Sequence, residues 1–332
     1  MILGNVELHN IAETKELWNG SHQLQRVPEH VRVHLNEGAQ LRCLSAANAE
    51  IRFVCDGNSA RVTLSAATSG VFRVAFGEFL SPIAFPIGGS PLTIEIERPE
   101  NLRHARPTAT DGHAFDSRVF RILLPNTTVQ LFRVEGDNVR PPKPEQLPMV
   151  RYLSYGTSIT EGGCATSPHL AYVAQAARRI GADLINLGMS GSCHAEAQMA
   201  DYIASRDDWH IATLALSVNM MGGFTVEEFR RRVEYTVRTV AATGRPVLCI
   251  TLYPYFVGLS ENHRSEEEKA EAFRQALRDA VSSVGRSNVS VVEGSTILDT
   301  PAGLSADMIH PSDFGMMRMG ENLAGRLSRL LS

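Results

Sequence analysis

The sequence predicts two domains, an all-β sandwich in the first part of the chain and an α/β domain with a parallel sheet in the second. Short runs of alternating apolar and polar residues fill the first 135 residues, which is typical of half-buried strands. From residue 149 onward, continuous apolar runs alternate with helical stretches. That second pattern is typical of a parallel sheet covered by helices on both faces.

The first domain, residues 1–135, is expected to consist of short strands. The alternating runs are VRVHL, EIRFV, ARVTL, FRVAF, LTIEI, RVFRI and TVQLF. Turn-forming stretches such as CDGN, IGGSP and LPNT separate them. Many short strands without long helices between them favour an antiparallel sandwich or jelly roll.

Residues 136–148 are rich in proline and polar residues and predict a semi-rigid linker. The second domain, residues 149–332, is expected to hold strands buried on both faces, at MVRYLSYG, ADLINLGM, IATLALSV, RPVLCITLYP and NVSVVEG. Helices are predicted between and after them, at HLAYVAQAARRI, TVEEFRRRVEYTVRTVAAT, SEEEKAEAFRQALRDAVSSV and FGMMRMGENLAGRLSRLL.

Composition excludes several classes of function. The 332-residue chain is 43% hydrophobic and carries a formal net charge of −4 with its basic residues scattered, which argues against a nucleic-acid or anionic-membrane partner. No apolar run is long enough to cross a bilayer. The start, MILGNVELHN, lacks the features of a secretory signal, so a cytoplasmic location is expected. The five cysteines are dispersed, and no disulfide framework or structural zinc site is expected.

Polar and flexible residues follow the predicted parallel strands. Because ligands bind outside the carboxyl ends of such strands, these residues are expected to meet at one edge of the sheet. They are Ser158 in GTSIT, Gly188, Ser190 and Gly191 in NLGMSGSCHAE, Asn219 in SVNM, and Asp307 and His310 in DMIH.

This set has the parts that an acyl-transfer site requires. Ser158 is the candidate nucleophile, His310 its general base, and Asp307 the group that orients the imidazole. The backbone N–H groups of Ser158 and Gly191 and the side-chain amide of Asn219 are candidate donors of an oxyanion hole. On its own, the stretch around Ser158 favours a helix N-cap, but the other residues together favour the nucleophile.

The same segments resemble the four blocks of the SGNH hydrolases, the GDSL-like esterases and lipases. GTSIT is similar to the GDS block, Ser190–Gly191 to the glycine block, SVNM to the GxND block and DMIH to the DxxH block. The resemblance implies a flavodoxin-like three-layer domain and ester hydrolysis without a cofactor or metal. It also implies that Ser158, Gly191, Asn219, Asp307 and His310 take the roles given above.

The sandwich followed by such a domain also resembles certain carbohydrate acetylesterases of that superfamily. This predicts a serine esterase for small acyl groups, such as acetyl, on a carbohydrate-like alcohol. Thr157 replaces the Asp of the GDS block, and Ser217 and Met220 flank Asn219 where Gly and Asp are common, so the match is not to the blocks usual among lipases.

Two rival functions stay open, a lipase or lysophospholipase, and a non-catalytic carbohydrate-binding protein. A homo-oligomer also stays open.

Several residues near the site have alternative interpretations. Gly188 competes with Gly191 for the oxyanion role and is otherwise a bend. His194 and Glu196 are expected in the first turn of a helix rather than at a metal. Tyr253, Tyr255 and Phe256 either wall the substrate pocket or pack beneath a loop.

Overall fold

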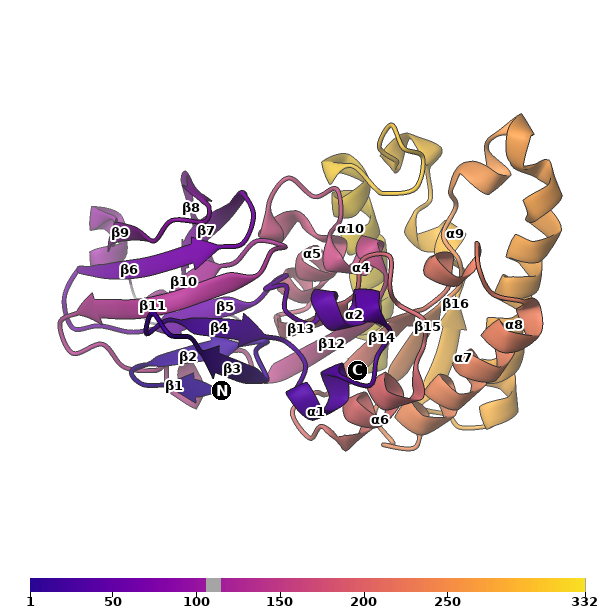
Figure 1. Cartoon of the computed structure of the whole chain (residues 1–332), viewed down its shortest axis with the longest axis horizontal. Coiled ribbons are helices and arrows are strands. Elements are labelled where there is room, and N and C mark those ends of the chain that lie inside the picture. The colour runs from indigo at the N-terminus through magenta and orange to yellow at the C-terminus, as the bar shows by residue number, and fades with distance from the viewer. Residues whose placement is uncertain (106–114, 332) are drawn as a thin grey trace.

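A computed structural model describes residues 1–105 and 115–331 of the chain. It has an antiparallel β half built from the N-terminal part and an α/β half built from the C-terminal part (Figure 1). The predicted fold class, a β-sandwich followed by a three-layer α/β domain, is therefore confirmed.

Two antiparallel sheets pack face to face in the N-terminal half. One has the strand order β1-β2-β5-β10-β7-β8 and the other β3-β4-β11-β6-β9. Their inward side chains form one core, with Phe53 stacked on Phe120. The strands are β1 Ile2–Leu3, β2 Val6–His9, β3 Glu13–Glu16, β4 His22–Gln25, β5 Glu50–Phe53, β6 Ser59–Ala66, β7 Gly70–Phe76, β8 Phe79–Ile87, β9 Leu92–Glu97, β10 Phe120–Leu123 and β11 Val129–Gly136, and helix α3 spans Glu100–Arg103.

The strand predicted at VRVHL is wrong. These residues lie in α1 (Glu29–Arg32) and the turn after it, and α2 (Glu37–Arg42) follows. Val31, Leu35 and Ala39 are buried while Val33 is 44% exposed. The buried side chains pack into the core of the α/β half, beside which Figure 1 shows both helices.

The α/β half contains one parallel sheet with the order β13-β12-β14-β15-β16. Its buried side chains separate into two clusters, one beneath α6, α7 and α8, the other beneath α5, α9 and α10. The elements are β12 Val150–Gly156, α4 Ser158–Glu161, α5 Tyr172–Arg179, β13 Ala182–Gly188, α6 Ala197–Ser205, β14 Ile211–Ala215, α7 Val226–Ala241, β15 Val247–Ile250, α8 Glu267–Val284, β16 Val289–Val292, α9 Gly294–Ile297 and α10 Asp313–Leu331.

The segment predicted as a linker, residues 136–148, is attached to the N-terminal half. Val54 and Arg140 exchange two backbone hydrogen bonds, at 2.9 and 3.0 Å. A short 3-10 helix, η1 (Pro144–Gln146), lies within the segment.

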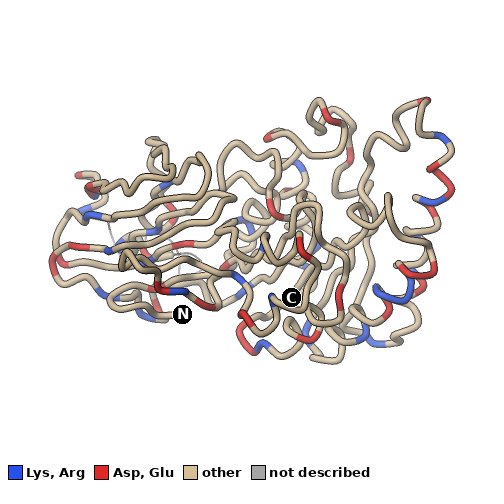
Figure 2. Tube along the Cα trace, in the orientation of Figure 1, with Lys and Arg blue, Asp and Glu red and all other residues tan. Residues whose placement is uncertain are grey.

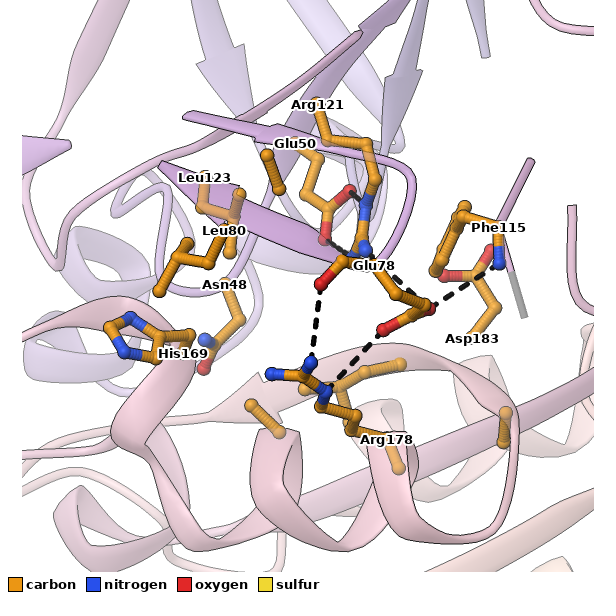
Figure 3. A pocket seen from close by; sticks show the side chains of 15 residues that line it. Asn48, Glu50, Glu78, Leu80, Phe115, Arg121, Leu123, His169, Arg178 and Asp183 are labelled. Carbon is orange, nitrogen blue, oxygen red and sulfur yellow. Dashed lines mark hydrogen bonds and ion pairs between the residues drawn. The ribbon is translucent and has the colours of Figure 1, made fainter. Parts of the chain in front are cut away.

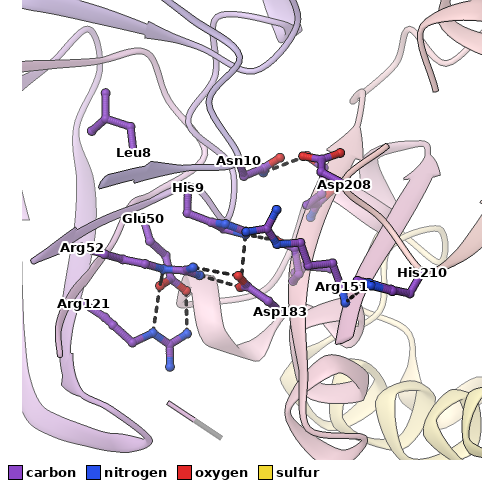
Figure 4. Close-up of polar contacts among 12 residues, drawn as sticks. Leu8, His9, Asn10, Glu50, Arg52, Arg121, Arg151, Asp183, Asp208 and His210 are labelled. Carbon is purple, nitrogen blue, oxygen red and sulfur yellow. Dashed lines mark hydrogen bonds and ion pairs between the residues drawn. The ribbon is translucent and has the colours of Figure 1, made fainter. Parts of the chain in front are cut away.

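A buried ionic network joins the two halves (Figure 4). Arg52 on β5 donates two hydrogen bonds to Asp183 on β13, at 2.6 and 2.8 Å, and a third to Glu50. His9 Nε2 lies 3.2 Å from the same Asp183 carboxylate and 2.5 Å from the carbonyl of Leu184. Burial raises the pKa of Asp183, but the Arg52 guanidinium outweighs it and holds that pKa below its usual value. The carboxylate therefore stays charged inside the interface.

A cavity lies beside this network, between the sheet of β7 and β10 and helix α5 (Figure 3). Glu78 reaches across it, with its carboxylate 3.8 Å from Arg121 and 3.5 Å from Arg178. None of the predicted catalytic residues is among those that line this cavity.

Charged residues of both signs alternate along the chain in both halves (Figure 2). None of the described helices combines the length and apolar character that a membrane span requires.

Candidate active site

Ser158 lies at the first turn of α4, directly after β12 ends at Gly156. The N-cap of this helix is Thr157, whose Oγ1 accepts the N–H of Ile159 at 3.4 Å. The cap role considered for Ser158 thus belongs to its neighbour, and Ser158 Oγ lies 2.8 Å from Nε2 of His310 instead. The hydroxyl at position 157 explains how the turn accommodates Thr in place of Asp, since both residue types cap helices.

His310 and Asp307 lie on a tight loop before α10. Leu304 and Pro311 form an isolated bridge across this loop, and Met308 within it has a positive φ of 55°. Nδ1 of His310 lies 2.7 Å from Oδ2 of Asp307. The structure therefore brings Ser158, His310 and Asp307 into one hydrogen-bonded chain.

The Asp307 carboxylate is held in its charged form. Partial burial raises its pKa, but hydrogen bonds from the His310 ring, from the backbone N–H groups of His310 and Ile309 and from Ser305 Oγ outweigh burial, so that the pKa lies below its usual value. An ionised Asp307 keeps the proton of the neutral imidazole on Nδ1 and leaves Nε2 free to accept one.

The two candidate glycines of the loop after β13 have different surroundings. A Cβ on Gly188 would lie 2.3 Å from the backbone nitrogen of Glu161, so this glycine allows β13 and α4 to approach closely. Gly191 has φ +68°, open space where its Cβ would be, and a place in the lining of the Ser158 cleft. A left-handed backbone of this kind favours glycine. Close packing thus accounts for Gly188, and Gly191 is the residue that faces the cleft.

Asn219 lies in η3 (Val218–Met220), a 3-10 helix after β14. Its Oδ1 accepts the backbone N–H of Cys193 at 3.1 Å. This bond leaves the Nδ2 group of Asn219 as the end of the amide that can donate into the cleft.

Ser158, His310, Gly191 and Asn219 line an open cleft of about 500 Å³, within the range of small-molecule sites. Of the three aromatic residues considered for its wall, Tyr255 and Phe256 line the cleft, whereas Tyr253 is buried in the core beneath the sheet. The full lining is Arg42, Ser158, Gly163, Ser190, Gly191, Val218, Asn219, Met221, Gly222, Tyr255, Phe256, Glu266, Ile309 and His310.

Sequence reasoning missed three charged residues at this site, Arg42 and Glu266 in the lining of the cleft and Glu161 beside Ser190. Arg42, at the end of α2, lines the cleft and donates from Nε to the carbonyl of Ser190 at 3.1 Å. Glu161, buried in α4, accepts the N–H of Ser190 at 2.7 Å. Arg42 lies beyond the misassigned VRVHL run and belongs to no motif, and the GTSITE stretch gave no reason to separate Glu161 from an ordinary first-turn acid.

Cys164, Asp307 and His310 place ligand atoms within 4.8 Å of one another, as a metal would require. Asp307 and His310 already belong to the hydrogen-bonded chain with Ser158. The absence of a metal from this site stays a prediction. His194 and Glu196 precede α6, and Glu196 accepts from the backbone and side chain of Asn36 at 2.6 and 3.0 Å. Their expected place in the first turn of a helix is wrong, because α6 begins at Ala197 and Glu196 is its N-cap.

The model of the GDSL-like lipase/acylhydrolase family matches residues 150–328, more than half of the chain. The chain belongs to this family. The predicted resemblance to the SGNH hydrolases is thereby confirmed, and the protein is a carboxylic ester hydrolase. A search of curated protein sequences found no match.

Solved structures share the whole architecture. A salicylyl-acyltransferase from a tetracycline biosynthetic pathway is 16% identical, with a TM-score of 0.79 over 98% of this chain and 95% of that one. An acetyl xylan esterase from the rumen bacterium Butyrivibrio proteoclasticus is 10% identical, with a TM-score of 0.60 over 100% and 97%. A family 2 carbohydrate esterase from Clostridium thermocellum, solved with cellohexaose, is 16% identical, with a TM-score of 0.57 over 85% and 92%. At these identities the likeness concerns the fold.

Proposed function

We propose that the protein hydrolyses small acyl esters, with acetyl esters of carbohydrates as the preferred class, through an acyl-enzyme on Ser158. The observation that carries the proposal is the continuous chain of hydrogen bonds from Ser158 Oγ through His310 to Asp307, with Ser158 and His310 in the lining of an open cleft. This arrangement is the one that activates a serine hydroxyl at neutral pH.

In the first half-reaction, Ser158 Oγ attacks the ester carbonyl carbon and its proton passes to Nε2 of His310. The carbonyl oxygen becomes an oxyanion, which accepts hydrogen bonds from the N–H groups of Ser158 and Gly191 and from the Asn219 amide. The bond to the alcohol then breaks, and the alcohol leaves with the proton from His310. Asp307 stabilises the imidazolium while it exists.

In the second half-reaction, water attacks the acyl carbon and gives its proton to His310. The second oxyanion collapses, the bond to Ser158 breaks, and the proton on His310 returns to Ser158 Oγ. The free acid leaves, and the three residues are ready for another ester.

Tyr255 contributes a neutral side chain to the wall of the cleft. Tyr255 Oη is buried in the cleft lining and has no hydrogen-bond partner among the described residues. Burial, with Glu266 nearby, raises the pKa of Tyr255 to about 12, so its hydroxyl stays neutral and able to donate. The fold shared with an acetyl xylan esterase and a cellohexaose-bound carbohydrate esterase supports a carbohydrate ester as the substrate class.

The test compares the wild type with Ser158→Ala on p-nitrophenyl acetate, butyrate and octanoate, and then on a panel of acetylated sugars. Removal of the nucleophile is expected to lower kcat by about 10⁴-fold or more. Ser282→Ala, at an exposed position of α8, is the matched control and should keep wild-type activity. Circular dichroism verifies that each variant is folded.

Each outcome has a defined meaning. Activity highest on acetate and lost in folded Ser158→Ala would support the proposal. Octanoate turned over as fast as acetate would favour a lipase. Sugar binding without turnover, unchanged by the substitution, would indicate a carbohydrate-binding protein, and substantial activity in folded Ser158→Ala would reject Ser158 as the nucleophile.

The acyl acceptor needs its own measurement, because one structural neighbour is a salicylyl-acyltransferase. We expect water to be the acceptor. The assay on p-nitrophenyl acetate is repeated with a small alcohol or a sugar added, and free acid is separated from new ester. The ratio of the two products measures how the acyl group divides between water and the added alcohol. New ester as the main product at low alcohol concentration would identify an acyltransferase instead.

A further inference from the structure

The loop that carries Gly191 comprises residues 188–193. A segment of the N-terminal half, residues 26–42, holds this loop in place. Three carbonyl groups at alternate positions of this loop each accept a hydrogen bond from a side chain of residues 26–42. The bonds are Arg26 Nη2 to Gly188 O at 2.9 Å, Arg42 Nε to Ser190 O at 3.1 Å, and Asn36 Nδ2 to Ser192 O at 3.0 Å. One face of the loop is therefore fixed by residues about 150 positions earlier in the chain.

The segment is anchored in the core of the α/β half and contacts the loop directly. Its helices α1 and α2 bury their apolar face in the core of the α/β half. Asn36 also caps α2 by accepting the N–H of Ala39 at 3.0 Å. A Cβ on Gly38 would lie 2.3 Å from Ser192 Oγ, so the start of α2 is in direct contact with the loop.

The bond from Arg42 has a special position within this support. The carbonyl of Ser190 and the N–H of Gly191 belong to one planar peptide unit, in which they point in opposite directions. A donor that fixes the carbonyl therefore fixes the direction of the N–H. The guanidinium is charged, so this bond is stronger than a neutral one and also polarises the peptide unit.

This constraint matters because Gly191 has φ +68° and no side chain to oppose rotation of the peptide unit before it. The N–H of Ser190, which belongs to the preceding peptide unit, donates to the Glu161 carboxylate. The orientation of the Ser190 carbonyl depends on two donors, Arg42 Nε and Ser192 Oγ, and each lies 3.1 Å from the carbonyl oxygen.

We propose that Arg42 is a positioning residue of the oxyanion hole. Through its bond to the Ser190 carbonyl it holds the Gly191 N–H toward the substrate oxygen. The N-terminal half thus supplies part of the catalytic geometry. This inference rests on the role of Gly191 in the proposed function.

Arg42 is also the member of the support best suited to a test. Arg26 is fully buried and Asn36 caps a helix, so replacing either would disturb folding. The Arg42 side chain is exposed, and among the described residues it donates to Ser190 O alone. Because Ser192 Oγ keeps its own bond to that carbonyl, the loss on removing Arg42 should be smaller than the loss of a donor itself.

The experiment compares Arg42→Met and Arg42→Lys with Arg32→Met on p-nitrophenyl acetate. Methionine keeps the apolar length but removes the donor. Arg32 lies on α1 of the same segment, where it pairs with Glu29 and donates to the Gln40 carbonyl, and among the described residues it has no hydrogen bond to the loop, so its variant is the control. We expect Arg42→Met to lower kcat by about tenfold to a hundredfold and to change KM by less than about twofold. Arg42→Lys should recover part of the loss, and Arg32→Met should behave as wild type.

A second readout separates positioning from a general structural effect. A small alkylboronic acid adds to the active serine as a tetrahedral anion, and its affinity should weaken in Arg42→Met in parallel with kcat. The melting temperature should stay within about 2 °C of wild type. Rates are expressed per folded molecule at the assay temperature, so lost stability does not imitate lost positioning.

The outcomes against the inference differ from those against the proposed function. Unchanged kcat and boronate affinity in Arg42→Met would overturn the role of Arg42, even with Ser158→Ala inactive. A raised KM with unchanged kcat would also overturn it and make Arg42 a substrate-binding residue. Activity that survives in folded Ser158→Ala would instead reject the nucleophile on which the inference depends.

Discussion

The side-chain amide of Asn219 has its two ends in different surroundings. Oδ1 accepts the Cys193 N–H, and the residue lines the cleft beside Ser158. Because Oδ1 is engaged, we expect Nδ2 to donate to the developing oxyanion. Asn219→Ala should then lower kcat by about 100- to 1000-fold, the usual cost of losing one such donor, with little change in KM. Steady-state hydrolysis of p-nitrophenyl acetate gives both constants.

Asn219→Asp is the matched variant for this prediction. It keeps the shape and the acceptor for Cys193 but replaces the donor with a second acceptor. Its loss of kcat should be at least as large as that of the alanine variant. Wild-type kcat in Asn219→Asp would show that Nδ2 does not contact the oxyanion.

At the same scale, the residues that sequence reasoning could name are those with chemistry of their own. Ser158, Asp307 and His310 stand out because a nucleophile, an acid and a base follow strands of one sheet, and the structure joins them within 2.8 Å. Arg42 gives no such signal. Its role depends on a backbone carbonyl 148 residues away, and only the folded chain reveals that contact.

Single elements show why most strands could be predicted and one could not. The run from Val31 to Leu35 alternates over only five residues, and its first and last apolar positions are also four apart. Side chains four residues apart lie on one face of a helix, just as side chains two residues apart lie on one face of a strand. Ala39 continues the four-residue series, and the buried residues Val31, Leu35 and Ala39 show that the helical period is the real one.

The short helix α4 has a stabilising role that its sequence does not reveal. Glu161 accepts the Ser190 N–H at 2.7 Å and lies 3.7 Å from the buried guanidinium of Arg26. Glu161→Leu would leave that buried charge without its carboxylate, which typically costs about 3–5 kcal/mol. Urea unfolding of the variant and the wild type measures the difference in the free energy of unfolding.

Glu161→Gln separates the charge from the hydrogen bond at this position. The amide oxygen of glutamine can still accept the Ser190 N–H, so we expect a smaller loss of stability than for leucine. If both variants unfold at the wild-type urea concentration, the pairing of α4 with Arg26 has no net stabilising role.

At the scale of the whole molecule, the two halves are joined by a buried polar contact, beside the apolar packing of α1 and α2 on the α/β half. Asn186 on β13 donates to Asn48 Oδ1 at 2.7 Å, and Asn10 donates to the Asn186 carbonyl at 3.0 Å, next to the Arg52–Asp183 pair. Sequence patterns located both halves, since each has its own periodicity. They could not locate this interface, because a buried arginine or aspartate in a strand looks the same as an exposed one until its partner is known.

The interface also predicts how stability depends on pH. The folded pKa values of Asp183 and Glu50 lie below their ordinary values of 3.8 and 4.5, because burial, which raises them, is outweighed by the neighbouring arginines. Burial and Arg52 lower the pKa of His9 below 6.5. In all three cases the unfolded chain binds protons more readily than the folded one, so acid favours unfolding.

We therefore expect the free energy of unfolding to be highest near pH 7, to begin falling below about pH 6.5 as unfolded His9 becomes protonated, and to fall further below about pH 5. Asp183→Asn should lose about 3–5 kcal/mol at pH 7 because it leaves Arg52 short of a partner, and its stability should depend less on pH between 3 and 5. Asp279→Asn, which removes an exposed partner of Arg230, should remain close to wild type at pH 7. Urea titrations at several pH values measure all three proteins, and an Asp183→Asn curve parallel to the wild-type curve would show that acid destabilises the molecule elsewhere.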